Sequence, residues 1–178
     1  MSVGNQLRSY VAVLPKARRN RVDLLRWLMR RPQLLGANAG YEMALLASAK
    51  TDPRLKALAE LKAGTLITCD YCIDIGSALA RRAGVTDAQL RALPSFRSSQ
   101  EFNETEKLVL ELAEAMTRVP TRIGADLRGR LLSHFSRTQL VELTATVAWE
   151  NHRGRLNQAL DVRPSGFSDG MVCAVPEG

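Results

Sequence analysis

The sequence predicts an all-α protein, a single-domain helical bundle, and three observations lead to this prediction. Apolar residues recur at helical spacing along nearly the whole chain. No stretch of useful length alternates apolar and polar residues as a half-buried strand does. Helix caps and helix-breaking residues separate the periodic segments. Because 178 residues suffice for one domain with its own core, we expect a helical domain over residues 1–166 and a flexible tail over residues 167–178.

The first four expected helices begin after a loop that contains Pro15. The first covers residues 22–31 and is ended by Pro32, and the second covers residues 34–50. The third covers residues 53–67, because Asp52 can cap it and Pro53 suits a first helical turn. The fourth runs from the pair Cys69 and Cys72 to residue 83, where a glycine favours a left-handed stop.

The remaining helices are predicted mainly from their N-terminal caps. Thr86 and Gln89 form a capping box for a short helix that ends near residue 93. Asn103 and Glu106 form another, which opens a helix to about residue 118. A further helix covers residues 125–134, and Ser136 caps a long final helix to about residue 160.

The net charge is +7, which raises the question of nucleic-acid binding. The basic residues are scattered and interleaved with glutamates, and no helix-turn-helix, zinc-finger or aromatic RNA-binding signature accompanies them. We therefore expect no nucleic-acid partner. No apolar run approaches the roughly 18 residues of a membrane span, and residues 1–5 lack the apolar core of a signal peptide. These features predict a cytoplasmic protein without a membrane partner.

The chemistry of the chain is expected at Cys69 and Cys72, two cysteines at the start of a helix. At this spacing both sulfurs can come within disulfide range, and the free amides of the helix start stabilise a thiolate. A redox-active dithiol is the favoured interpretation. A zinc half-site completed by Cys173, His134 or His152 is a second, although none of these forms another close pair. A third is a buried pair without a role.

Two stretches of the chain together resemble a known family. They are residues 61–92, with Cys69-Asp70-Tyr71-Cys72-Ile73-Asp74-Ile75-Gly76 and Ala83-Gly84-Val85-Thr86, and residues 140–157, with Trp149-Glu150-Asn151, Arg153 and Asn157. In this order they resemble the carboxymuconolactone decarboxylase superfamily, on its alkylhydroperoxidase-D-like branch. The resemblance implies an all-helical fold of that type, assembled into homo-oligomers (trimers or hexamers).

The resemblance also implies a function, the reduction of hydroperoxides through the dithiol. Cys72 is then the attacking thiolate and Cys69 the resolving thiol. The reductant is a dithiol of lipoyl type carried by a partner protein, and no metal, flavin or haem is implied. Such a protein is a peroxiredoxin-type antioxidant oxidoreductase.

The chain departs from that branch in its proton relay. The branch has a glutamate twelve residues before the first cysteine and a histidine four after the second, where this chain has Ala57 and Gly76. The candidate replacements are Glu60, one turn beyond Ala57 on the same helix, Asp74, and His152 on the final helix. Asp74 follows Cys72 by two residues, which points it away from that sulfur, and it also suits a helix start as a dipole partner.

Two alternative functions remain open beside the peroxidase. The absence of the relay is compatible with a redox-sensing or non-catalytic oligomer of the same fold. The superfamily also contains decarboxylases, so a decarboxylase or lyase acting on a small organic acid or lactone is the other alternative.

Overall fold

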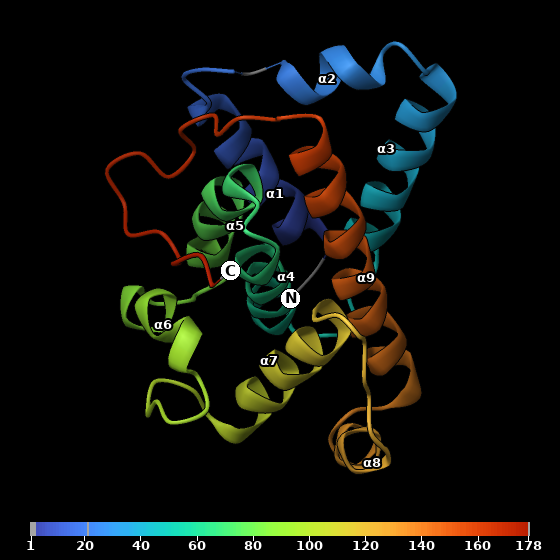
Figure 1. The fold of residues 1–178 in the computed structure, drawn as a ribbon, viewed down its shortest axis with the longest axis vertical. Helices are drawn as coiled ribbons and strands as arrows, with labels where there is room; N and C mark the ends of the chain where they lie inside the picture. Colours follow the sequence, from blue (N-terminus) through green and yellow to red (C-terminus); the bar gives the residue numbers. More distant parts are fainter. Residues whose placement is uncertain (1–2, 21, 178) are drawn as a thin grey trace.

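The computed structural model describes residues 3–20 and 22–177, and within them the fold is helical with no strand (Figure 1). The all-α prediction is confirmed. The helices are α1 (Val3–Val13), η1 (Leu14–Lys16), α2 (Asp23–Leu28), α3 (Pro32–Ala47), α4 (Pro53–Ile67), α5 (Asp70–Arg82), α6 (Asp87–Ala92), η2 (Leu93–Ser95), α7 (Glu104–Thr117), α8 (Ala125–His134) and α9 (Arg137–Ala159).

Helix α4 is the centre of the bundle and packs against α5, α7 and α9 (Figure 1). Leu58 and Leu61 pack against α5, α6 and α7, in a core that includes Ile73. Ala59 and Ala63 pack against a second core of α7, α8 and α9 residues. A helix buried on several sides needs apolar residues around much of its surface, and α4 has them. It is therefore the rigid element from which the following cysteines are held.

The predicted caps are present and explain most of the helix starts. The Asp52 side chain accepts a hydrogen bond from the backbone N–H of Arg54 at 2.9 Å. Thr86, Asn103 and Ser136 each form a complete capping box. These side chains satisfy amides that have no partner inside the helix, so the local sequence alone specifies where α4, α6, α7 and α9 begin.

The N-terminal part differs from the prediction. Residues 3–13 form helix α1, where no helix was expected, and Val13 is buried against Ala78 and Phe167. Helix α1 packs against α5 and α3, and these tertiary contacts hold a helix that is too short to be stable alone. Helix α3 starts earlier than predicted because Pro32 occupies its first turn, where a proline is tolerated.

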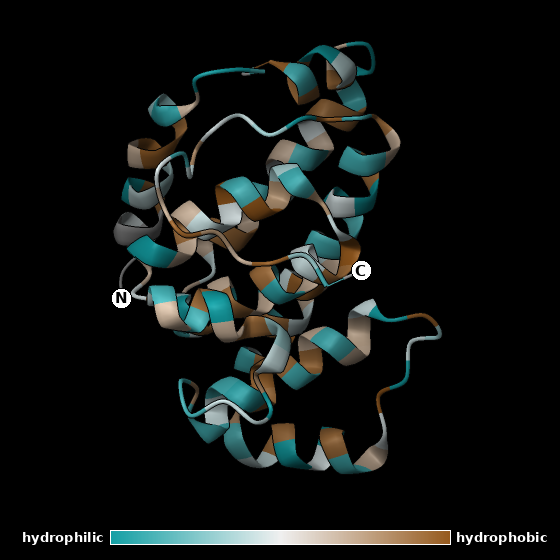
Figure 2. Cartoon of the chain, turned by 60° about the vertical axis from the view of Figure 1, so that its left-hand side comes forward, coloured by the Kyte–Doolittle hydropathy of each residue, from teal (hydrophilic) through white to brown (hydrophobic). Residues whose placement is uncertain are grey.

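Helices α2 and α3 form an outer layer of the molecule with unusual exposure. The sequence of α3 is mostly apolar, yet none of its residues is buried. Figure 2 shows hydrophobic residues, in brown, on this outer layer as well as in the interior. Exposed apolar surface of this extent is typical of an interaction surface.

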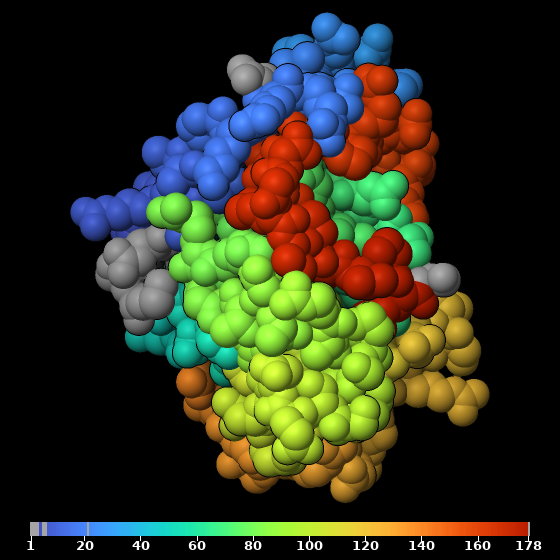
Figure 3. Space-filling model, turned by 90° about the vertical axis from the view of Figure 1, so that its left-hand side faces the viewer, coloured from blue at the N-terminus to red at the C-terminus, as the bar shows by residue number. Residues whose placement is uncertain are grey.

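The C-terminal segment, residues 163–177, is ordered against the bundle, in contrast to the flexible tail expected for residues 167–178. Phe167 and Ala174 are buried, and Glu177 forms an ion pair with Lys62 and accepts a hydrogen bond from Thr65 at 2.7 Å. Figure 3 shows the segment, in red, lying across the green α5–α6 region. The loss of helical pattern after Arg163 suggested disorder, but buried side-chain and backbone contacts hold the segment. Residue 178 lies outside the described residues.

Among the described residues, no helix combines the length and apolarity that crossing a bilayer requires.

Candidate functional site

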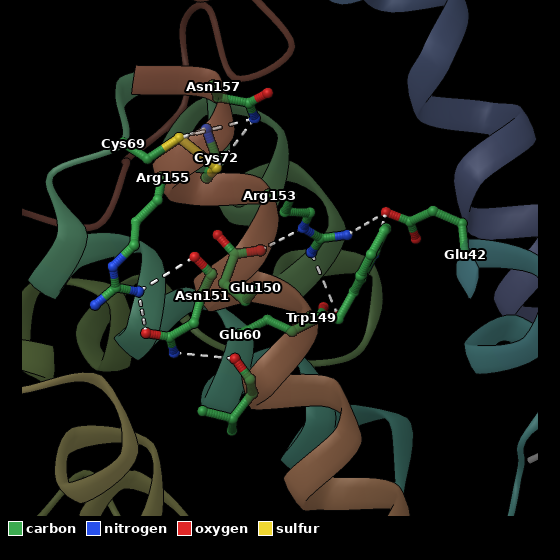
Figure 4. Close-up of polar contacts among 11 residues, drawn as sticks. Glu42, Glu60, Cys69, Cys72, Trp149, Glu150, Asn151, Arg153, Arg155 and Asn157 are labelled. Carbon is green, nitrogen blue, oxygen red and sulfur yellow. Dashed lines mark hydrogen bonds and ion pairs between the residues drawn. A yellow bond between two sulfur atoms is a disulfide. The ribbon is translucent and has the colours of Figure 1, made fainter. Parts of the chain in front are cut away.

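The cysteine pair lies at the junction of α4 and α5. Helix α4 ends at Thr68, which has a left-handed backbone (φ 58°), and Cys69 then caps α5. The Cys69 sulfur accepts a hydrogen bond from the backbone N–H of Cys72 at 3.2 Å. In the structure the two cysteines form a disulfide, with a Cα–Cα distance of 5.2 Å (Figure 4). The helix N-terminus therefore faces sulfur, and this arrangement favours the thiolate after reduction.

Two glycines allow α4 and α9 to approach the disulfide closely. A Cβ atom at Gly64 would lie 3.2 Å from Glu150 Oε1 and 3.5 Å from Cys72 Cβ. A Cβ atom at Gly154 would lie 3.2 Å from Ile67 Cδ1 and 3.8 Å from Cys69 Cβ. Any side chain at Gly64 would occupy the space between the carboxylate and the cysteine, so this glycine brings the two groups together.

Cys72 lines an elongated cavity of about 330 Å³. The walls are mainly leucine and other apolar side chains from α2, α3, α4, α5 and α9. Cys69 lines a different feature, an open groove at the surface beside Thr68 and Asp161. Asn157 lines both spaces. The two cysteines thus line different spaces, Cys72 a mainly apolar cavity and Cys69 a surface groove.

Asn157 is the polar side chain in hydrogen-bond range of the sulfurs. Its Nδ2 atom lies 3.5 Å from Cys72 Sγ and 4.0 Å from Cys69 Sγ (Figure 4). An amide N–H directed at sulfur stabilises negative charge on it. The Asn157 side chain can therefore support a Cys72 thiolate.

Arg153 also lines the cavity and is surrounded by three carboxyl groups. Its Nη1 atom is 2.6 Å from Glu42 on α3, its Nη2 atom is 3.4 Å from Glu60 on α4, and its Nε atom donates to Glu150 (Figure 4). Burial opposes the charge of Arg153, but the neighbouring carboxylates outweigh it and hold its pKa well above the usual value. Three helices are joined through this one guanidinium.

Glu150 is the carboxylate best placed for proton transfer near the dithiol. Its side chain is 2% exposed. One of its oxygens is paired with Arg153, whereas Oε1 is buried without a hydrogen-bond partner and lies next to Gly64, which in turn lies next to Cys72 Cβ. Burial raises the pKa of Glu150 to about 7, against the lowering effect of Arg153. A group that titrates near neutrality can both accept and donate a proton under physiological conditions.

Comparison with known proteins agrees with this geometry. Residues 32–115, which contain α3, α4 and both cysteines, match the carboxymuconolactone decarboxylase family. This segment of the chain is similar to the carboxymuconolactone decarboxylase family. The predicted resemblance is thereby confirmed.

Two curated relatives are uncharacterized proteins. YnjA of Escherichia coli K12 is 35% identical over 127 residues, which cover 71% of this chain and 66% of YnjA. YdfG of Bacillus subtilis 168 is 27% identical over 107 residues, which cover 60% of this chain and 73% of YdfG.

Solved structures share the fold. ATU0492 of Agrobacterium tumefaciens, a protein of unknown function assigned provisionally to the AhpD antioxidant defence proteins, superimposes with a TM-score of 0.72 at 22% identity, covering 78% of this chain and 94% of that chain. The debrominase Bmp8 without ligand superimposes with a TM-score of 0.74 at 21% identity, covering 93% of this chain and 87% of that chain. At these identities the likeness establishes the fold.

Of the predicted relay substitutes, Glu60 lies in the same cavity as Cys72. Burial raises its pKa, and Arg153 partly offsets this. No contact joins its side chain to either sulfur among the described residues, and Glu60 reaches the dithiol region through Arg153. Ala57 and Gly76, the positions where the resemblance led us to expect the relay, also line the cavity. A Cβ atom at Gly76 would lie 3.1 Å from Leu61, so a histidine there requires a local shift.

Asp74 points away from the sulfurs, as its spacing from Cys72 suggests. Its carboxylate accepts hydrogen bonds from four successive backbone N–H groups, those of residues 165–168, and from the Ser168 hydroxyl. Burial raises the pKa of Asp74, but the bonds from Ser168, Phe167 and Gly166 outweigh it, and the pKa lies below its usual value. The structure gives Asp74 a role in holding the C-terminal segment on α5.

Replacing Asp74 by asparagine is expected to destabilise the protein by about 2 kcal/mol, because hydrogen bonds to a charged acceptor are lost. Since the folded-state pKa is depressed, the stabilisation by Asp74 is present above its usual pKa of 3.8 and is lost as the pH falls below it. Urea unfolding at pH 7 and pH 3 measures both effects. A parent-like free energy of unfolding for Asp74→Asn at pH 7 would contradict this role.

His152 lies on the exposed side of α9. Its ring stacks on Trp149 at a centroid distance of 4.7 Å, and no contact links it to the sulfurs among the described residues. Within the same part of the chain, no group of three or more histidine, cysteine, aspartate or glutamate side chains is placed to hold a metal ion. Cys173, proposed as a zinc ligand, contacts Ser168 instead of the dithiol.

Sequence reasoning did not nominate Glu150, Arg153 and Asn157 as site residues, although all three belong to the family-like final stretch. The spacing of residues along α9 could have indicated two of them. Glu150 and Asn157 share one face of α9 with the buried residues Leu143 and Val147, as their spacing of seven and three or four residues requires. A polar residue on a buried helix face is informative, because it needs either a structural partner or a functional reason to be there.

Proposed function

We propose that this protein is a thiol-dependent oxidoreductase that reduces hydroperoxides through Cys72 and Cys69. The observation that carries the proposal is that Cys72, which is bonded to Cys69, lines the same mainly apolar cavity as Glu150, whose Oε1 atom has no hydrogen-bond partner. A peroxide that enters this cavity meets a nucleophile and a proton donor together, as peroxide cleavage requires.

The first step consumes the peroxide. The Cys72 thiolate attacks the terminal oxygen of R–O–OH, an S–O bond forms, and the O–O bond breaks. Cys72 becomes a sulfenic acid, and the leaving alkoxide takes a proton from Glu150 to give the alcohol ROH. Asn157 Nδ2, 3.5 Å from the sulfur, and the N-terminus of α5 stabilise the thiolate before the attack.

The second step forms the disulfide seen in the structure. Cys69 attacks the sulfenic sulfur and displaces hydroxide, which is protonated to water. A dithiol reductant, proposed to be of lipoyl type on a partner protein, then returns two electrons and two protons and leaves as a disulfide. The electrons balance without a metal or organic cofactor. This cycle requires a pool of reduced dithiol, as the cytoplasm maintains.

Turnover with cumene hydroperoxide and dihydrolipoamide, measured as peroxide consumed, tests the proposal. We expect many equivalents of peroxide to be reduced per dithiol. Oxidation of the cysteine pair without further turnover would instead support a redox-sensing protein, a second candidate that Ala57 and Gly76 favour because neither side chain can move a proton.

We also propose that the protein forms homo-oligomers, and the outer layer of α3 supports this. Leu34 and Met43 are 55% and 56% exposed on a helix of mostly apolar sequence. A surface of this kind in water favours association with a second copy.

Replacing Leu34 and Met43 together by glutamate is expected to dissociate the oligomer, because charged side chains resist burial in an apolar interface. Size-exclusion chromatography with light scattering should then give the 19.6 kDa mass of one chain instead of a multiple of it. Val119→Glu is the control, since Val119 is 86% exposed in a loop. A single-chain mass for the parent would contradict the proposal.

A further inference from the structure

The cavity next to Cys72 contains a single basic side chain, Arg153, among the described residues that line it. Each of its three guanidinium nitrogens already faces a carboxylate, those of Glu42, Glu60 and Glu150. A carboxylate of a ligand would therefore have to compete with three carboxyl groups for this guanidinium.

The indole donor near Arg153 is also engaged, because Trp149 Nε1 donates to Glu42 Oε1 at 2.8 Å, the same oxygen that Arg153 contacts. The other polar side chains of the lining are uncharged, and they are Tyr10, Asn38, Tyr71 and Asn157. The rest of the lining is mainly leucine and other apolar side chains. An anion entering here would compete with three carboxyl groups for one cation, and it would lose its hydration in a mainly apolar space.

We infer that the cavity binds uncharged, bulky apolar organic molecules and rejects their carboxylate-bearing analogues, with Glu42 as a residue that determines this specificity. This inference rests on the proposed function and narrows its substrates to neutral organic hydroperoxides. A volume of about 330 Å³ lies at the lower end of the range for small-molecule sites and suits an aryl or branched alkyl group. Glu42 belongs to α3, so the outer layer formed by α2 and α3 contributes to ligand selection as well as to the cavity wall.

Binding of two matched, unreactive alcohols tests the inference. The probes are cumyl alcohol, the product expected from cumene hydroperoxide, and the same alcohol with a para-carboxylate. They are titrated at neutral pH into the oxidised Trp27→Phe protein, in which Trp149 on the cavity wall is the remaining fluorophore. We expect cumyl alcohol to change the Trp149 fluorescence and the carboxylate to bind at least about tenfold more weakly.

Two variants of the same background locate the effect. Glu42→Gln removes one negative charge beside Arg153. It is expected to lower the ratio of the affinity for cumyl alcohol to the affinity for the carboxylate by at least about threefold. Glu111→Gln removes the same charge from a surface pair with Arg130 and is expected to leave the ratio unchanged. A ratio that stays constant in Glu42→Gln, or changes equally in both, would remove Glu42 from the inference.

The comparison of the two probes within the parent protein does not depend on the folding of any cavity variant. Equal or tighter binding of the carboxylate, or no fluorescence change with either probe, would overturn the inference. Turnover of cumene hydroperoxide is measured on the same preparation. If turnover occurs without selectivity, the inference fails and the proposed function stands, whereas selective binding without turnover supports the cavity assignment and contradicts the peroxidase.

Discussion

Cys72→Ser is expected to lower hydroperoxide reduction by about 10³-fold or more, the largest effect of any single substitution in this protein. A serine hydroxyl is not ionised near neutrality, so neither Asn157 nor the N-terminus of α5 has a thiolate to stabilise. The measurement is steady-state peroxide consumption with excess dithiol. Equal rates for the parent and the variant would end the peroxidase proposal.

Substitution of the other cysteines separates attack from resolution. Cys69→Ser retains Cys72 and is expected to reduce one equivalent of peroxide and then accumulate a sulfenic acid, detectable by mass spectrometry as one added oxygen. Cys173→Ser is the matched control, because Cys173 is the remaining cysteine and contacts Ser168 away from the dithiol. It is expected to keep the parental rate.

Glu150→Gln has the second largest expected effect, a loss of about 10²–10⁴-fold in turnover, because glutamine fills the same space but cannot transfer a proton. In the parent, the rate should fall as the pH rises through about 7, where Glu150 loses the proton that the leaving alkoxide needs. The variant should lack this decrease. Glu114→Gln, which alters a carboxylate paired with Arg97 and Arg118 outside the cavity, is the control.

The same substitution has an expected effect on stability, with a definite sign. The folded-state pKa of Glu150 is raised from 4.5 to about 7, so the folded protein retains a proton that the unfolded chain releases. The stability contributed by the protonated group is present below pH 4.5 and is lost as the pH rises to about 7. The thermal unfolding temperatures of the parent and of Glu150→Gln should therefore differ less near pH 4.5 than near pH 7. If the stability of Glu150→Gln depended on pH as that of the parent does, another group would be responsible for the dependence.

Local signals in the sequence were sufficient for the fold class and for most helix starts. Capping residues such as Asp52, Thr86 and Asn103 act within one turn of chain, so they can be recognised without the tertiary structure. Helix α1 was missed because it is held by its contact with α5 and with residue 167, which a local pattern does not reveal.

The candidate site was also predictable only where it depends on local sequence. Cys69 and Cys72 are adjacent on one turn and could be predicted to pair, as they do in the structure. Glu150 and Arg153 approach them only because α9 crosses α4 at Gly64. That approach depends on the packing of helices far apart in the chain, so replacements for the relay were sought too close to the cysteines in sequence, at Asp74, or on the wrong face of α9, at His152.

The hydrogen bonds between Asp74 and the C-terminal segment affect how the results of a mutational survey of this protein should be interpreted. Asp74 lies two residues after Cys72, and its partners lie about ninety residues further along the chain. Substitutions at Ser168 would loosen the helix that carries the attacking sulfur. A screen that scores activity alone would therefore report such positions as active-site hits. Residual activity normalised to the fraction of folded protein would assign them correctly, as anchors of the redox helix rather than participants in its chemistry.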